Sequence, residues 1–349
     1  MGALSSVKRS LRDWILFRFR WQRLYEAVSA AERAVFGRHV GIETCSRCQL
    51  ACPLCSTAHP KDDWRRDHQS VIGKGSLRAA DFAAFLEKSG KIRKLELSNW
   101  GEIFLNPELP EILRLAHQHG VIVEASNGVN MNAAGDEMLE ALVRYGVRHV
   151  LVSIDGATDE TYRVYRRNGQ LERVLKNVDR INHFKKAHRS ELPRLTWRMI
   201  VFGHNEHEIP KARAMAEARG MRFTALMNLD DSFSPVKDPA YVERETGLRI
   251  EREQQRALER AGEQFDFCAQ LWDAPQVNWD GKLLGCCCNN MGDFGNVFEQ
   301  GLEAALNGER YQYAKRMLLG AEPPRADIPC TTCPIYRGTP YARADLKPG

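Results

Sequence analysis

Short apolar stretches alternate with longer amphipathic stretches through the middle of the 349-residue chain. The short stretches are too brief for buried helices, and most are rich in Val, Ile and Leu, as buried strands are. Six of them predict strands, at 39–44, 93–98, 121–126, 148–154, 195–202 and 222–227.

The stretches between these strands carry apolar residues at helical spacing. In one of them Leu109, Ile112, Leu113 and Ala116 share a face, and Gly120 follows. A glycine just past the last apolar residue signals the end of a helix. Strand–helix repeats of this kind predict an α/β fold with a parallel sheet. Six units are fewer than the eight of a closed barrel, so we predict a partial (β/α)6 TIM-like barrel.

Composition divides the chain into four parts. Residues 1–37 are predicted as a basic amphipathic helical segment, and the barrel spans 38–228. Residues 229–262 are charged and contain two prolines, which predicts a connector with one helix at about 249–262. Residues 263–349 hold six of the ten cysteines and predict a small C-terminal α+β domain.

The charge and the cysteine content narrow the class of protein. The net charge of +5 comes from residues 1–40, which hold eight Lys or Arg and three Asp or Glu. The neutral remainder argues against a nucleic-acid-binding face. No secretory signal and no run of about 18 apolar residues is visible, so we expect a cytoplasmic protein. Clustered cysteines in that compartment usually bind metal.

An apolar stripe runs along the N-terminal segment, and arginines occupy much of the remaining surface. Its members repeat at alternating gaps of three and four: Trp14, Phe17, Trp21, Leu24, Val28, Ala31 and Val35. Such a helix packs on the barrel or on a second copy of the chain. Alternatively it contacts the inner face of a membrane peripherally, with its aromatic side down. The sequence leaves both interpretations open.

Cys48, Cys52 and Cys55 follow the first predicted strand with the spacing C-x3-C-x2-C. Three thiolates can hold three irons of a 4Fe–4S cluster and leave the fourth iron open to a cofactor or substrate. Barrels collect their chemistry at this end of the strands. A structural zinc site is the alternative. Its fourth ligand would be Cys45, His59 or His68.

The cysteine triad resembles the cluster-binding motif of the radical S-adenosylmethionine (SAM) enzymes, and three later motifs agree with it. They are Gly101-Glu102 after the second strand, Ser126-Asn127-Gly128 after the third, and Ser153-Ile-Asp155 on the fourth. They resemble the family's Gly-Glu motif, its Thr-Asn-Gly motif and the strand that contacts the SAM ribose. Each piece alone is compatible with ordinary turn chemistry, but their joint order points to this family.

The resemblance implies which residues bind SAM. Gly101 and Glu102 would accept hydrogen bonds from its ammonium group, Arg166 would meet its carboxylate, and Leu54 would pack on its adenine. Asn127, Ser153 and Asp155 complete the expected set. One electron from the reduced cluster would cleave SAM to a 5′-deoxyadenosyl radical, while the protein positions and shields the reactants.

The C-terminal cysteines form a second set. Cys268 and Cys286 flank a predicted hairpin with its turn at Asp280-Gly281. The set resembles that of the auxiliary-cluster domain in the SPASM and twitch subfamilies. The resemblance implies a second 4Fe–4S cluster, held by Cys268, Cys286, Cys330 and Cys333. A zinc ribbon of four cysteines is the alternative.

Cys287 and Cys288 follow Cys286 directly, and the resemblance does not require them as ligands. They either pack as small apolar side chains or, as a cysteine does in related epimerases, donate a hydrogen atom to a substrate radical. These two residues are therefore candidate catalytic groups.

The resemblance as a whole implies an enzyme that cleaves SAM reductively and abstracts a hydrogen atom from a substrate C–H bond. A second cluster with four cysteine ligands would accept an electron, which favours oxidation of a small molecule such as a sugar. Radical epimerisation, peptide modification and a non-catalytic iron–sulfur or zinc scaffold are the alternatives. The expected partners are a small-molecule substrate and an electron donor such as flavodoxin or ferredoxin, with no nucleic acid.

Overall fold

The computed structural model describes residues 38–58, 71–228, 230–249 and 270–337. Several predictions lie outside the described residues. They are those for the N-terminal segment, His59, His68 and Cys268, and for nearly all of the connector helix at 249–262.

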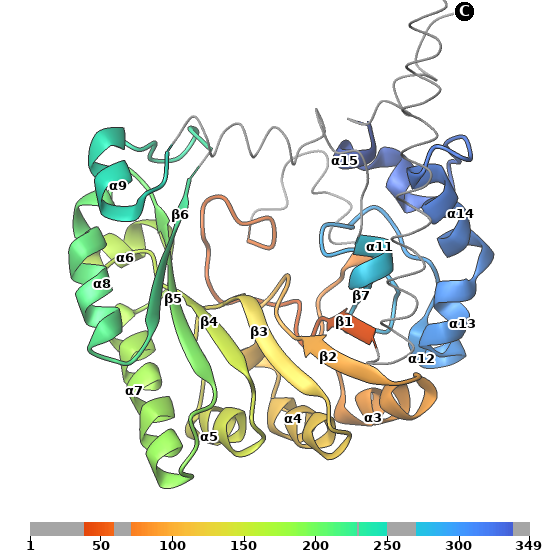
Figure 1. Ribbon diagram of the computed structural model, residues 1–349, viewed down its shortest axis with the longest axis horizontal. Coiled ribbons are helices and arrows are strands. Elements are labelled where there is room, and N and C mark those ends of the chain that lie inside the picture. Colours follow the sequence, from red (N-terminus) through yellow and green to blue (C-terminus); the bar gives the residue numbers. More distant parts are fainter. Residues whose placement is uncertain (1–37, 59–70, 229, 250–269, 338–349) are drawn as a thin grey trace, which may run out of the picture.

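One parallel sheet organises the molecule, with the strand order β6-β5-β4-β3-β2-β1-β7 (Figure 1). The strands are β1 (Arg38–Ile42), β2 (Ile92–Glu96), β3 (Ile122–Val129), β4 (His149–Ser153), β5 (Arg194–Val201), β6 (Arg222–Met227) and β7 (Gln276–Val277). The first six match the predicted strands to within a few residues. Because β6 and β7 stand at opposite edges and do not pair, the sheet is a partial barrel, and the predicted fold class is confirmed.

Helices cover the outer face of the sheet (Figure 1). They are α3 (Ala79–Lys88), α4 (Leu109–Gln118), α5 (Asp136–Arg144), α6 (Asp159–Tyr165), α7 (Leu171–Ala187) and α8 (Ile209–Glu217). Gly120, which follows α4, has a φ of 67°, the left-handed conformation that ends helices at low cost. The apolar stripes therefore predicted both the helices and their ends.

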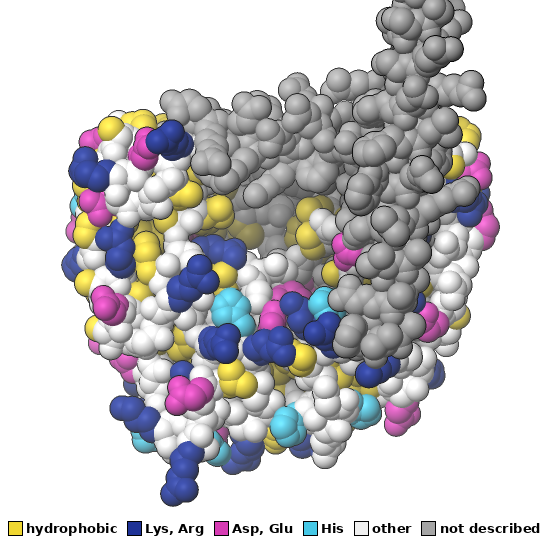
Figure 2. Space-filling model, in the orientation of Figure 1, with side chains coloured by type: hydrophobic (Ala, Val, Ile, Leu, Met, Phe, Trp, Pro, Cys, Tyr) yellow, Lys and Arg dark blue, Asp and Glu magenta, His cyan; other side chains and the backbone are white. Residues whose placement is uncertain are grey.

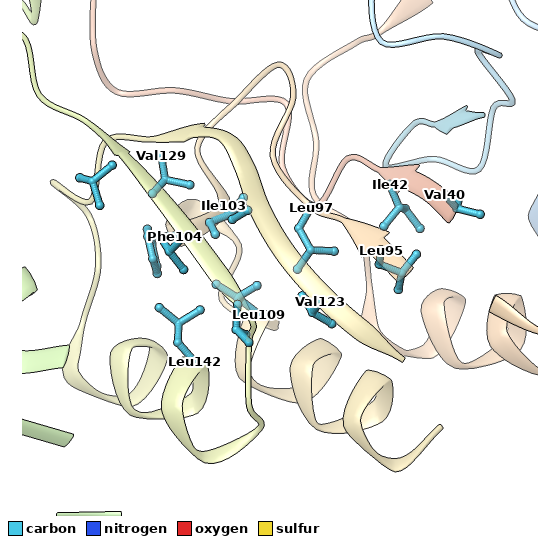
Figure 3. Close-up of a cluster of buried hydrophobic side chains, with 14 of the residues drawn as sticks. Val40, Ile42, Leu95, Leu97, Ile103, Phe104, Leu109, Val123, Val129 and Leu142 are labelled. Carbon is cyan, nitrogen blue, oxygen red and sulfur yellow. The ribbon is translucent and has the colours of Figure 1, made fainter. Parts of the chain in front are cut away.

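The main core lies between the strands and these helices (Figure 3). Leu95 and Val123 of the sheet belong to the same buried cluster as Leu109 and Leu142 of the helices. Burial of such a side chain contributes about 1.5–3 kcal/mol each. This packing holds the carboxyl ends of the strands at one edge, where the cysteine triad lies.

The C-terminal region extends the barrel sheet through β7, which pairs in parallel with β1. The predicted hairpin is confirmed, since Val277 bridges Leu283 and Gly281 turns the chain with a φ of 86°. The Gln276 side chain covers Gly41, where a Cβ would lie 2.1 Å from Oε1. Four short helices follow: α12 (Val297–Gln300), α13 (Leu302–Asn307), α14 (Glu309–Leu318) and α15 (Pro334–Arg337).

A helix not predicted from the sequence lies in the connector. It is α9 (Pro239–Thr246), and the Asp238 carboxylate caps it by accepting a hydrogen bond of 2.9 Å from Tyr241 N. A proline is tolerated in the first turn, because the N–H group that it lacks would have no hydrogen-bond partner within the helix. The two prolines predict a connector, although Pro239 in fact begins this helix.

Candidate functional site

The loop after β1 brings the cysteine triad to the carboxyl edge of the sheet. Cys48, Cys52 and Cys55 are free thiols, and they pack in a small apolar cluster with Tyr165 and Phe202, apart from the main core. Burial raises the pKa of Cys48 to about 12. The site is thus shielded from water on its barrel side.

Two side chains place hydrogen-bond donors near the sulfur atoms of the triad. Asn130 Nδ2 lies 3.6 Å from Cys48 Sγ, and Arg166 Nη1 lies 3.8 Å from Cys52 Sγ. Hydrogen bonds of this kind to ligand sulfurs tune the potential of an iron–sulfur cluster. Three thiols with such donors fit a cluster that has one open iron.

A zinc site at the triad would need a fourth ligand, and among its three candidates only Cys45 lies within the described residues. Cys45 Sγ instead donates to Arg47 O at 3.8 Å and accepts from Ser76 Oγ at 3.4 Å. Cys45 is fully buried and has these partners in place of a metal.

The Gly-Glu loop lies directly against the cysteine loop. Glu102 N donates to Arg47 O at 2.8 Å, and a Cβ on Gly101 would lie 2.1 Å from Cys45 O, so no larger residue fits. The Glu102 carboxylate is buried and accepts from Asn130 N at 2.6 Å; burial raises its pKa to about 7. Backbone N–H groups already donate hydrogen bonds to this carboxylate, so its contact with the ammonium group of SAM stays a prediction.

Arg166 is held beside the triad by a buried ion pair. Its Nε lies 2.5 Å from Asp155 Oδ2, while Asp155 Oδ1 accepts from Ile200 N at 2.6 Å. Burial raises the pKa of Asp155, and the Arg166 charge opposes that shift. The pair fixes the guanidinium next to Cys52, where a carboxylate on the open iron would need a cation. The contact of Arg166 with SAM stays a prediction.

The remaining predicted SAM residues lie at neighbouring strand ends. Gly128 has a φ of 124°, and a Cβ there would lie 2.5 Å from Ser153 Oγ, so only glycine lets β3 approach β4 this closely. Asn127 Nδ2 donates to Ser98 O at 2.6 Å. Leu54 packs on the small apolar cluster of the cysteines. The structure thus brings all these residues to one edge of the sheet.

Sequence reasoning missed two features of the site. Tyr165, Phe202 and Phe233 form an aromatic wall next to the cysteines, with ring centroids 4.5–5.7 Å apart. Glu43 is fully buried and accepts hydrogen bonds from Trp100 N and Gly101 N, at 2.7 and 3.3 Å. A charged residue that follows an apolar strand directly could have signalled Glu43. The aromatic wall has no local signal, because its members are far apart in sequence.

The second cysteine set contacts the Gly-Glu loop through one side chain. Asn99 Nδ2 donates to Cys287 O at 3.0 Å, and Cys287 N donates to Gln270 Oε1 at 3.0 Å. The sulfurs of Cys287 and Cys288 lie 3.6 Å apart. The two cysteine sets, more than 200 residues apart in sequence, therefore share one junction.

Family comparisons agree with this geometry. The model of the radical SAM superfamily matches residues 42–216, half of the chain, and that of the SPASM iron–sulfur cluster-binding domain matches residues 268–334. The chain therefore belongs to the radical SAM superfamily. It is a radical SAM enzyme with a SPASM domain, and these domains bind SAM, a 4Fe–4S cluster and auxiliary iron–sulfur clusters.

Two curated relatives illustrate the range of chemistry nearby. GTP 3′,8-cyclase of Chlorobaculum tepidum is 28% identical over 207 residues, which cover 56% of each chain. PqqA peptide cyclase of Xanthomonas campestris is 28% identical over 184 residues, which cover 50% of this chain and 42% of the relative. The chain spans about half the length of the curated relatives it matches.

Solved structures share the fold. Streptococcus suis SuiB has a TM-score of 0.55 at 13% identity, covering 83% of this chain and 71% of SuiB. The enzyme anSMEcpe with bound AdoMet has a TM-score of 0.53 at 14% identity, covering 80% of this chain and 84% of anSMEcpe.

Among the described residues, no helix has the length and apolar character needed to cross a bilayer.

Proposed function

We propose that this enzyme abstracts a hydrogen atom from a C–H bond of a small polar molecule and completes a two-electron oxidation. SAM and the first cluster supply the radical chemistry when bound, while the chain binds, orients and shields the reactants. Cys48, Cys52 and Cys55 are the proposed ligands of that cluster. The observation that carries the proposal is the polar character of the inner face of the sheet.

The inner face is the side of the sheet without helices (Figure 1). Hydrogen bonds or ion pairs of 2.9 Å connect its side chains across strands, from Lys94 to Glu124, from Ser126 to His149, and from His149 to Thr196. Closed barrels instead fill this space with branched apolar side chains. A polar inner face suits a substrate with hydroxyl or amine groups, such as a sugar.

The second cluster is proposed to accept the electron that the substrate radical releases. Its four proposed ligands, Cys268, Cys286, Cys330 and Cys333, would leave no iron open for substrate. The contact from Asn99 to Cys287 supports this role, because it joins the auxiliary loop to the loop beside the triad. A flavodoxin or ferredoxin is the proposed reductant of the first cluster.

Peptide modification is a second candidate. Two similar proteins support it through their names: the PqqA peptide cyclase, and SuiB, whose structure has been solved with its precursor peptide SuiA.

Epimerisation is supported by a separate observation, the neighbouring thiols of Cys287 and Cys288. If one of them donates hydrogen, Cys287→Ala or Cys288→Ala will still form 5′-deoxyadenosine but will release no product. Unchanged turnover in both variants would remove that role.

The test is anaerobic reconstitution of the full chain. We expect about eight irons per chain, and 5′-deoxyadenosine from SAM under strong reductant. A Cys52→Ala variant should form none, whereas Cys45→Ser, which alters a thiol outside the proposed ligand set, should retain the reaction. About four irons would refute the second cluster. No 5′-deoxyadenosine from the unaltered chain would refute the proposed activity.

Peripheral membrane contact through residues 1–37 is a separate proposal, supported by the apolar stripe of that segment. Flotation with anionic liposomes should carry the full chain upward and leave a chain without residues 1–37 behind. Equal flotation of both chains would contradict it.

A further inference from the structure

Arg198 crosses the inner face of the sheet. It belongs to β5, yet its Nη1 donates to Asn127 O at 3.2 Å and its Nη2 to Ser126 O at 3.3 Å, both on β3. Because β4 lies between these strands, the guanidinium spans the width of one strand. It is therefore stretched over the inner face and does not fold back along its own strand.

This guanidinium has no carboxylate partner within ion-pair distance among the residues that the structure describes. The acids near it are engaged elsewhere: Glu96 with Ser98 and Ser126, Glu124 with Lys94 and Arg148, and Asp155 with Arg166. Burial lowers the pKa of Arg198, and Asp155 opposes that shift. Two of its five N–H groups are bonded to carbonyl oxygens, which leaves donors for an anion.

Other basic groups lie near Arg198 on the inner face. Burial lowers the pKa of His149, Glu124 opposes that shift, and the charges of Arg198, Arg222 and Lys94 add to the lowering. Basic side chains and histidines lie over the strands in the middle of this view, with acidic side chains among them (Figure 2). A partly buried cation without a carboxylate partner is costly, and a bound anion would offset that cost.

Arg198 also lies close to the place of chemistry. Ile200, two residues further along the same face, packs against the apolar cluster that holds Cys52. Two residues of strand span about 7 Å. A small molecule that places a C–H bond beside the triad can therefore reach this guanidinium with its other end.

We propose that Arg198 binds an anionic group of the substrate, a carboxylate or a phosphate, and so sets which C–H bond faces the radical. Its planar fork matches both groups in a bidentate manner. The inference rests on the proposed function and narrows its substrate to small molecules that carry a negative charge.

The test measures anion binding to the reconstituted full chain by isothermal titration calorimetry, without reductant. Malonate represents carboxylates, and pyrophosphate represents phosphates. We expect one of them to bind, Arg198→Gln to weaken that binding about tenfold or more, and Arg198→Lys to weaken it less, since a point charge remains. The probe that binds identifies the class.

Arg173→Gln is the matched control. Arg173 also donates to a backbone carbonyl, Asn132 O at 3.5 Å, and also has no carboxylate partner in the described part of the chain, but it lies on α7 at the outer face. Its variant should bind the probe as the unaltered chain does. An equal loss in Arg173→Gln would mean non-specific binding and would overturn the inference.

Two other results would also overturn it: no binding of either probe by the unaltered chain, or unaltered affinity in Arg198→Gln. If that variant loses its iron or its circular dichroism spectrum, Arg198→Lys decides, and unchanged affinity there counts against the inference. Anion binding is measured without reductant, so its result does not depend on SAM cleavage. A protein that cleaves SAM but binds no anion therefore refutes only this inference. A protein that cleaves no SAM refutes the proposed function.

Discussion

Buried carboxyl groups define the site at the scale of single residues. Asp155, Glu43 and Glu102 are all within about 1% of full burial, and each is held by backbone amides or by an arginine. Removing one partner of a buried ion pair leaves an uncompensated charge, which is far more costly than breaking an exposed pair. These residues therefore combine structural and functional roles.

The Asp155–Arg166 pair gives the first prediction. Asp155→Ala should lower the free energy of unfolding by about 3–5 kcal/mol, measured by chemical denaturation, and should weaken SAM binding. Arg163→Ala, in the same region, breaks only the exposed pair with Asp159 at 2.7 Å and should cost no more than about 1 kcal/mol. Equal effects of the two variants would show that the buried pair has no special weight.

Glu43 gives a prediction for pH dependence. Burial raises its pKa from 4.5 to about 8, so the folded protein binds this proton more tightly than the unfolded chain does. The resulting stability is complete below about pH 4.5 and is lost as the pH rises through about 8. Between pH 6 and 8 the free energy of unfolding should fall by up to about 1.4 kcal/mol per pH unit from this group.

Denaturation of the metal-free, reduced chain at several pH values measures that slope. Glu43→Gln cannot ionise and should make the profile less steep, while Glu102, whose pKa burial raises to about 7, still contributes. Glu111→Gln is the control, because Glu111 is exposed and its pKa is lowered by Arg114, so it does not titrate in this window. A profile for Glu43→Gln as steep as that of the unaltered chain would contradict the prediction.

At the scale of elements, the loop 99–102 is the junction of the molecule. It is held by Glu43 at the end of β1, by Thr57, whose Oγ1 donates to Trp100 O at 2.7 Å, and by Asn99, which reaches Cys287. One short loop thus contacts the first strand, the triad loop and the auxiliary loop. A substitution in any one of these three segments should therefore alter the structure of the other two.

Asn99→Ala tests this junction. Loss of the bond to Cys287 should speed amide exchange in residues 99–102 and 286–288, measured by hydrogen–deuterium exchange, and should cost about 1 kcal/mol of stability. Asn182→Ala removes a comparable bond, to Arg219 O at 2.8 Å on the outer face, and should leave both segments unchanged. Faster exchange in only one segment would mean that the two loops are not coupled.

At the scale of the whole molecule, a shared sheet joins the two cysteine regions. Besides the pairing of β7 with β1, Arg38 forms a two-bond ion pair with Glu303, at 2.5 and 2.7 Å, and Phe85 packs on Phe298. Interfaces of this kind make neighbouring regions unfold together. The barrel and the SPASM region are therefore expected to form one cooperative unit.

Thermal unfolding checks that expectation. Far-UV circular dichroism and the absorbance of the iron–sulfur clusters should report coincident transitions. Val277→Asp, which places a charge at a fully buried position of β7, should lower the midpoint and separate the two signals. Two transitions in the unaltered chain would show that the regions unfold independently.

The sequence determined the elements of the barrel because its signals are local. Apolar runs marked six strands, glycines marked helix ends such as Gly120, and cysteine spacing marked both clusters. Each signal depends on neighbours within a few residues, where the periods of strands and helices are set by backbone geometry. The family followed from the order of these motifs.

Only the tertiary structure decided which distant residues meet. The sequence predicted β7 as part of a hairpin, but its pairing with β1, which extends the barrel sheet by one strand, came only from the tertiary structure. The bond from Asn99 to Cys287 and the reach of Arg198 across β4 each join segments that the sequence keeps apart. Contacts of this kind depend on the packing of the whole chain, so no local pattern predicts them.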